Sequence, residues 1–205
     1  MSGSPIAVGL TTSYPAACAL RQSEDGKGRW GAFQFHIDAP VAEADAWFVH
    51  DGLQSMLHAS CPPGNTAFIA AEPPAYKRYN QAFLRQFAHV LGCGSNTSHP
   101  RFHPSPVAVP WLVNKSFSEL QSEPFPEKTR EVSVICGQKR NIAGQRRRLA
   151  FVVRHAVPLL RADHFGRGFQ PVEDKWEALA PYRYSVAIEN SVCPRYFTEK
   201  ITDCF

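Results

Sequence analysis

The last third of the sequence alternates regularly between strand and helix patterns, which leaves few architectures open. The predicted strands cover residues 131–137, 162–168 and 184–190, and the predicted helices cover residues 143–160, 172–179 and 196–205. Strands that alternate with helices along a chain are typical of a parallel α/β sheet. We therefore expect an α/β domain whose ligand binds beyond the carboxyl ends of the strands.

The residues before this region give shorter signals. The apolar runs 46–50, 67–71 and 89–92 indicate buried strands. From Tyr76, aromatic and leucine side chains recur at helical spacings, which predicts a helix there. The stretch 118–130 is polar and contains prolines, so we interpret it as a linker between an N-terminal domain, 1–117, and a C-terminal domain, 131–205.

Composition excludes several classes of protein. The chain has 205 residues, 44% hydrophobic and 20% charged, with a net charge of +4, whereas disordered chains combine low hydrophobicity with high net charge. No apolar run approaches the roughly 18 residues of a membrane span, and no convincing signal peptide begins the chain. The six cysteines are scattered without a C-x-x-C pair, which favours free thiols in a reducing compartment.

A group of cations follows the predicted strand 131–137. It contains Lys139, Arg140, Arg146, Arg147 and Arg148. Cations at the beginning of a helix are unfavourable unless an anion lies nearby, so a phosphate ligand is a reasonable inference. A solvated basic face is the alternative. A nucleic-acid site is less favoured, because no aromatic residues are interleaved for base stacking.

Polar residues also follow the predicted strand 184–190. Glu189 and Asn190 end this run, and Thr198, Glu199 and Lys200 begin the next predicted helix. Lys200 would lie one helical turn from Tyr196. Ordinary helix capping by Thr198 explains part of this pattern equally well.

The segment 182–205 resembles the signature of the family 10 glycosyltransferases, the α-1,3/1,4-fucosyltransferases. The signature has E-N-S/T, a spacer and Y-x-T-E-K, and here it is E-N-S-V-C-P-R-Y-F-T-E-K without a gap. Flanking motifs agree in order: VSVICGQK, Arg-x-x-Phe, FGRG and DKWEALAPY. Upstream, FIAAEPPAYKRYNQAFLRQF resembles the acceptor-side half of bacterial members.

The resemblance implies a fold, a reaction and a set of site residues. The fold would be two Rossmann-like domains of the GT-B type, and the reaction an inverting transfer of L-fucose from GDP-L-fucose to a glycan hydroxyl. In the donor site, Arg148 and Lys200 would neutralise the diphosphate, Glu199 would hold the ribose, Asn190 and Tyr196 would line the pocket, and Glu189 would open the E-N-S motif. Glu72 would be the general base.

No cofactor is evident from the sequence. A D-x-D metal motif is absent, so the two cations would replace a metal in stabilising the charge that develops on departing GDP. Cys93, His99 and His103 fit no standard zinc spacing. Without the resemblance, Glu72 would be interpreted as a turn carboxylate before two prolines.

The resemblance also sets expectations about the whole chain. In the family, the T-E-K helix leads to a P-I-Y-x-G strand, whereas this chain ends at Phe205, so we expect a truncated member with little or no transferase activity. The alternative is a non-catalytic remnant with weak or no nucleotide binding. The partners would be a nucleotide-sugar donor and a glycan acceptor, such as a lipopolysaccharide side chain, and no nucleic acid. We expect a bacterial cytoplasmic enzyme at the inner membrane surface; peripheral membrane association and oligomeric state stay open.

Overall fold

The computed structural model, which describes residues 4–53, 57–94 and 98–204, divides into two compact units. Unit 1 comprises Met1–Pro110, Ser116–Gln121 and Cys193–Tyr196, and unit 2 comprises Trp111–Lys115, Ser122–Val192 and Phe197–Phe205. The chain is therefore mixed α/β, as the sequence predicts, and short segments of each half belong to the other unit.

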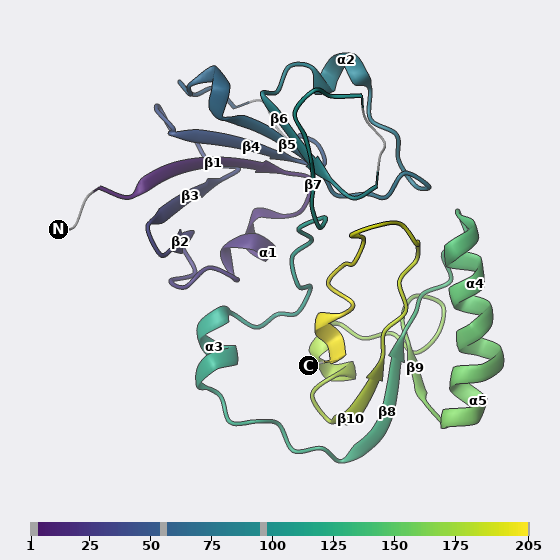
Figure 1. Ribbon diagram of the computed structural model, residues 1–205. Coiled ribbons are helices and arrows are strands. Elements are labelled where there is room, and N and C mark those ends of the chain that lie inside the picture. The colour runs from purple at the N-terminus through teal and green to yellow at the C-terminus, as the bar shows by residue number, and fades with distance from the viewer. Residues whose placement is uncertain (1–3, 54–56, 95–97, 205) are drawn as a thin grey trace. The chain divides into compact units, whose positions relative to one another are not determined.

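Unit 1 is built on a seven-stranded, mostly parallel sheet (Figure 1). Its strands are β1 Ile6–Thr12, β2 Arg29–Trp30, β3 Phe33–Ile37, β4 Ala46–His50, β5 Thr66–Ala70, β6 His89–Gly92 and β7 Phe102–Pro104. They lie in the order β2-β3-β1-β4-β5-β6-β7, and only the pairing of β2 with β3 is antiparallel. The predicted strands 46–50, 67–71 and 89–92 are confirmed to within one residue at each end.

Short helices connect these strands. They are α1 Ala16–Leu20, η1 Pro63–Asn65 and α2 Gln81–Leu84, and α3 Phe117–Ser122 follows the last strand. Thus the stretch 118–130, predicted to be a linker, contains most of a helix. The side chain of Trp30, in β2, packs edge-on against Phe117, which gives α3 an apolar contact.

The predicted helix from Tyr76 is wrong for most of its length. Only α2 is helical, because the Asn80 side chain accepts a hydrogen bond from the Ala82 amide at 2.8 Å and begins the helix there. The aromatic periodicity has another cause. Tyr79, Phe83 and Phe87 all pack around the ring of Phe68, which is completely buried in β5.

Unit 2 contains a three-stranded parallel sheet flanked by helices. Its strands are β8 Arg130–Ile135, β9 Asp163–Phe165 and β10 Tyr182–Val186, in the order β10-β8-β9. Its helices are α4 Ala143–Phe151, the π-helix η2 Val152–Ala156, α5 Val157–Leu160 and the 3₁₀ turns η3 Lys175–Ala178 and η4 Thr202–Cys204. The parallel sheet predicted for this region is confirmed.

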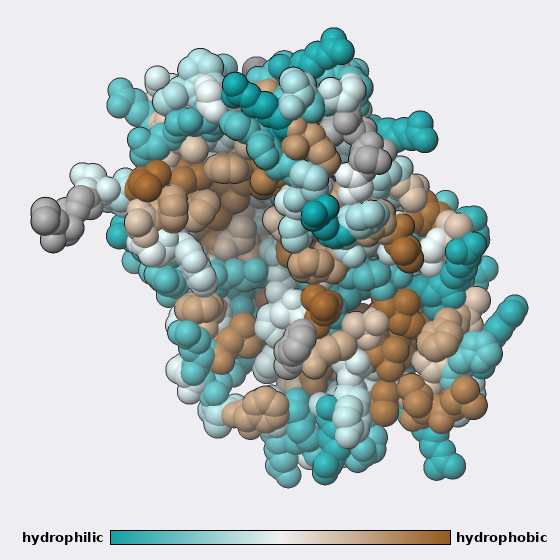
Figure 2. Space-filling view, viewed as in Figure 1, coloured by the Kyte–Doolittle hydropathy of each residue, from teal (hydrophilic) through white to brown (hydrophobic). Residues whose placement is uncertain are grey.

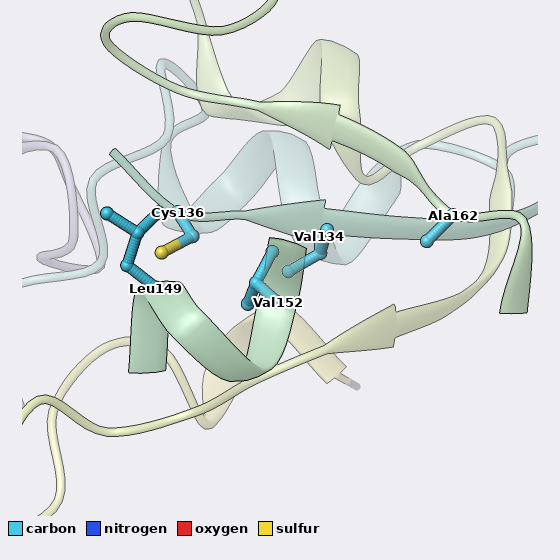
Figure 3. Packing of buried hydrophobic residues seen from close by; sticks show 5 residues of the cluster. All are labelled: Val134, Cys136, Leu149, Val152 and Ala162. Carbon is cyan, nitrogen blue, oxygen red and sulfur yellow. The ribbon is translucent and has the colours of Figure 1, made fainter. Parts of the chain in front are cut away.

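The core of unit 2 lies between β8 and the α4–η2 helix (Figure 3). Val134 and Cys136 come from the strand side, and Leu149 and Val152 come from the helix. The helical run 143–160 is as predicted. Pro158 has no N–H to donate to the preceding turn of the helix. The π-helix η2, whose turns are wider than those of an α-helix, ends two residues before this proline.

The outer side of this helix is partly apolar. Leu159 is 76% exposed and Leu160 is 50% exposed. In Figure 2, brown hydrophobic groups lie over α5, beside teal hydrophilic groups.

Three predicted elements of unit 2 are shorter than expected. Residues 172–179 form only η3, and of the predicted helix 196–205 only η4 is helical, with Phe205 outside the described residues. The predicted strand 184–190 is β10, which ends at Val186. Glu189 and Asn190 therefore lie in the loop beyond the strand. There the Glu189 side chain accepts a hydrogen bond from the Thr198 amide, a group that has no partner within a helix when it lies in the first turn.

Candidate functional site

The loop after β10 turns back so that Glu189 and Thr198 meet. Glu189 Oε1 accepts hydrogen bonds from the Thr198 amide at 2.7 Å and from the Thr198 hydroxyl at 2.9 Å. Lys200 Nζ donates to the same hydroxyl oxygen at 2.9 Å. The first and last residues of the E-N-S…T-E-K motif are thus joined through Thr198, which is buried.

Lys200 and Glu199 belong to a larger set of buried charges. Lys200 Nζ lies 3.3 Å from Glu199 Oε1, and Lys175 Nζ lies 3.7 Å from the same oxygen. Lys175 also forms a 2.6 Å ion pair with Asp203, whose other oxygen accepts from the Trp111 indole at 2.9 Å. Burial raises the pKa of Asp203, and the charge of Lys175 opposes this effect. Sequence reasoning missed both Lys175 and Asp203 as members of this site.

Arg148 reaches the same end of the sheet from α4. Its Nη1 donates to the Ile188 carbonyl at 3.4 Å, and its Nε is buried without a hydrogen-bond partner in the described part of the chain. Burial raises the pKa of the Cys136 thiol, while the nearby charges of Arg148 and Lys200 lower it. Lys200 Nζ lies 3.9 Å from Glu189 Oε2, so both cations lie at consecutive residues of the loop after β10.

Asn190 is held against the beginning of α4. A Cβ on Gly144 would overlap the Asn190 carbonyl, so only glycine permits this approach. The close contact joins the E-N-S loop to the helix that carries Arg148. The predicted residues Arg148, Glu189, Asn190, Glu199 and Lys200 therefore gather within unit 2.

The other predicted cations do not join them. Arg146 Nη1 donates to the Arg140 carbonyl at 3.0 Å, and both residues line a separate groove of about 320 Å³ with Arg154. Lys139 and Arg147 are exposed. Of the predicted cation group, only Arg148 lies at the strand ends, so the solvated-face alternative fits the remaining members.

Glu72, the predicted base, lies in unit 1 just beyond β5. Its backbone N–H donates to the Tyr79 hydroxyl at 3.1 Å, and that hydroxyl donates to Asp51. Lys77 Nζ forms a 3.1 Å ion pair with Asp51. Burial, followed by the hydrogen bond to Asp51, raises the pKa of Tyr79.

Sequence reasoning did not identify Asp51, Lys77 or Tyr79 as neighbours of Glu72. One signal was present, because Asp51 directly follows β4, and β4 pairs in parallel with β5. Polar residues at the carboxyl ends of adjacent parallel strands meet at one edge of the sheet.

Tyr196, predicted to line the donor pocket, belongs to unit 1. It ends the segment Cys193–Tyr196, and its amide donates to the Cys193 carbonyl at 3.1 Å. The structure therefore does not gather all the predicted donor residues in one unit.

Within residues 4–53, 57–94 and 98–204, no three His, Cys, Asp or Glu side chains are grouped to hold a metal ion. The His99 ring bonds to the Phe87 carbonyl, and the His103 ring to His89. None of the helices in the described part of the chain is both long and apolar enough to cross a bilayer.

Comparison of the chain with protein-family models, with curated proteins and with solved structures found no match.

Proposed function

We propose that the protein is an inverting glycosyltransferase that uses GDP-L-fucose as its donor. The observation that carries the proposal is that Arg148 and Lys200 reach neighbouring residues of the loop after β10: Arg148 donates to the Ile188 carbonyl, and Lys200 Nζ lies 3.9 Å from Glu189 Oε2. Two cations, one with a buried and unpaired Nε, suit a diphosphate. The gapless E-N-S…Y-x-T-E-K motif supplies the second line of support.

In the proposed donor site, the cations stabilise the leaving group. Negative charge develops on the β-phosphate as the bond from the sugar to GDP breaks. Arg148 and Lys200 are held in place by Ile188 and Thr198, so they need little rearrangement to meet that charge. Glu199 keeps acceptor capacity beyond its lysine contacts, and we assign it to the ribose hydroxyls.

In the proposed reaction, the acceptor hydroxyl oxygen attacks the anomeric carbon of fucose, and the Glu72 carboxylate removes the proton of that hydroxyl. A single base is sufficient for an inverting displacement. Tyr79 holds the backbone of Glu72 in place, because the Tyr79 hydroxyl oxygen accepts a hydrogen bond from the Glu72 amide. The proposal includes a GT-B arrangement, with the base and the donor site on different domains.

We place the reaction at the cytoplasmic face of a bacterial inner membrane, with a glycan such as a lipopolysaccharide side chain as acceptor. This part of the proposal rests on the family resemblance alone. A panel of oligosaccharide acceptors offered with labelled GDP-fucose would identify the acceptor and the linkage.

Calorimetric titration with GDP tests the donor site. The wild-type chain should bind GDP, and Arg148→Ala and Lys200→Ala should each weaken binding at least tenfold, because a charge-assisted hydrogen bond contributes about 1.5–3 kcal/mol. Arg146→Ala is the matched control, since Arg146 lies on the same helix but lines another groove. An equal loss in the Arg146 variant, or no binding by the wild type, would contradict the proposal.

Transfer of labelled fucose tests the role of Glu72. In a form of the protein that transfers fucose, Glu72→Gln should abolish the transfer and leave GDP affinity unchanged, because Glu72 does not belong to unit 2. A parallel loss of GDP affinity would refute its role as the base. GDP binding by a wild type that transfers no sugar would instead identify the non-catalytic remnant.

A further inference from the structure

Two cysteines that are 100 residues apart in sequence lie near each other in unit 1. Cys93 directly follows β6 and is only 4% exposed, whereas Cys193 is half-buried. The Cys193 side chain is close enough to the Cys93 thiol to raise its pKa. All six cysteines of the chain are free thiols, so both side chains are reduced.

The backbone holds the two cysteines side by side. The Gly94 amide donates to the Pro194 carbonyl at 3.2 Å, so the residues that follow the two cysteines are bonded directly. A Cβ on Gly94 would lie 3.8 Å from Cys193 Sγ. The main-chain bond therefore keeps the two segments together beside the two cysteines, which is the proximity that a disulfide requires.

We propose that Cys93 and Cys193 form a reversible disulfide that fastens the segment Cys193–Tyr196 to the end of β6. The segment belongs to unit 1, while the residues on both sides of it belong to unit 2. It lies inside the E-N-S…Y-x-T-E-K motif and carries Tyr196. Cys93 in turn lies close enough to Glu72 for their charges to interact.

A disulfide such as oxidised glutathione is a sufficient oxidant. The thiolate of Cys193, the more exposed partner, attacks one glutathione sulfur and releases the first glutathione, which takes up the proton lost by Cys193. Cys93 then loses its proton and attacks the Cys193 sulfur, which releases the second glutathione as a thiol. Two cysteine thiols are oxidised and one glutathione disulfide is reduced, so atoms and electrons balance.

The order of attack follows from burial. Burial, followed by the neighbouring Cys193 side chain, raises the pKa of Cys93 to about 12, so Cys93 stays protonated at neutral pH. A protonated and buried thiol is a poor first nucleophile, but it is well placed to resolve a mixed disulfide on its neighbour. The buried Cys136 and the exposed Cys204 have no cysteine partner of this kind among the described residues.

The test is a peptide map of the full chain after incubation with glutathione disulfide and alkylation of the remaining thiols. Trypsin releases Cys93 in the peptide 86–101 and Cys193 in the peptide 184–195, and each peptide contains no other cysteine. We expect the linked pair of these peptides to dominate and to disappear on treatment with dithiothreitol. Cys93→Ser and Cys193→Ser should each abolish it, and Cys204→Ser should leave it unchanged.

Several outcomes would overturn the proposal. These are a stable mixed disulfide on Cys193 without the linked pair, a link from Cys193 to Cys204, or a link between two chains. This readout involves no nucleotide, so it is independent of the proposed transferase activity.

One consequence does rest on the proposed function. Fixing the segment that carries Tyr196 should change GDP affinity at least threefold between the oxidised and reduced wild type, and Cys93→Ser should abolish the difference. An unchanged affinity in a chain that contains the linked peptides would refute this control of donor binding while leaving the disulfide established. Failure of both forms to bind GDP would refute the proposed function instead.

Discussion

Lys175 is the counter-ion of two buried carboxylates, Asp203 and Glu199, although the sequence presents it only as part of a polar run. Its neighbours Asp174 and Glu177 form a capping box on η3, which fixes the backbone from which Lys175 extends. The positive charge of Lys175 is needed because two carboxylates lie against it. A buried carboxylate that loses its cation retains the full desolvation cost.

Replacing Lys175 should therefore be costly. We expect Lys175→Met to lower the free energy of unfolding of unit 2 by about 3 kcal/mol, because Asp203 and Glu199 lose their shared cation. Lys175→Arg keeps the charge and should recover a large part of that loss. Urea denaturation of both variants measures the difference, and wild-type stability in Lys175→Met would show that the ion pairs contribute nothing.

Tyr79 gives a prediction about alkaline pH. Its pKa is raised in the folded chain above the ordinary 10.0, so the unfolded chain loses that proton first as the pH rises. The wild type should therefore lose stability above about pH 10, and Tyr79→Phe should lose less over the same range. Denaturation series at increasing pH measure this slope.

The same substitution has the opposite effect at neutral pH. There Tyr79→Phe should cost about 1–3 kcal/mol, because Asp51 and the Glu72 amide lose a hydrogen-bond partner. Tyr184→Phe is the control, since Tyr184 is 65% exposed. If the stability of Tyr79→Phe fell above pH 10 as steeply as that of the wild type, Tyr79 would not be the group that causes the loss of stability at alkaline pH.

At the scale of elements, the sequence predicted the strands β4, β5 and β6 and the helical run 143–160, but not the strands β1, β2, β3 and β7. Strands such as β4 and β5 are apolar runs whose length and burial agree, so their patterns identify them. The aromatic spacing from Tyr76 misled the prediction, because Tyr79 and Phe87 reach Phe68 from backbone outside α2. Burial against one large ring produces the same spacing as a helical face.

The predicted helix that begins at Tyr196 failed for a different reason. The Thr198 hydroxyl oxygen accepts from the Lys200 amide at 3.4 Å, as a helix cap does, but the hydroxyl also donates to Glu189, and no α-helix follows among the described residues. Such a long-range contact cannot be deduced from local propensity. The sequence therefore identified the residues of this motif but not the backbone that carries them.

The contact of α4 with the E-N-S loop gives a prediction for Gly144. In an exposed helix, Gly→Ala stabilises by about 1 kcal/mol. Here the new Cβ would overlap the Asn190 carbonyl, so we expect Gly144→Ala to destabilise unit 2 and to displace Arg148 from its place beside Ile188.

Thermal unfolding and GDP titration together measure this effect. Gly64→Ala is the control, because nothing lies within 4 Å of a Cβ at Gly64. Stabilisation of the Gly144 variant by the amount expected from helix propensity would show that the contact with Asn190 is not a close one.

At the scale of the whole molecule, much of the candidate donor site could be predicted from the sequence. Glu189, Glu199, Lys200 and Arg148 were identified by motif, and they gather because the carboxyl ends of parallel strands meet at one edge. The counter-ions Lys175 and Asp203 could not be predicted, because their role depends on burial. The membership of Cys193–Tyr196 in unit 1 was equally inaccessible, since chain order places the segment between parts of unit 2.

The division into two units predicts where GDP should act. A ligand that binds only the folded form stabilises it by about 2.7 kcal/mol at one hundred times its dissociation constant. If GDP binds through Arg148 and Lys200, it should slow hydrogen exchange in β8, β10 and α4 and leave β1, β4 and β5 unchanged, because those strands belong to unit 1. Hydrogen exchange of the full chain, read by mass spectrometry, resolves these elements, and Lys200→Ala should remove the protection at the same GDP concentration. Protection confined to unit 1 would locate the nucleotide away from the T-E-K motif. It would then contradict the roles that we assign to Arg148 and Lys200.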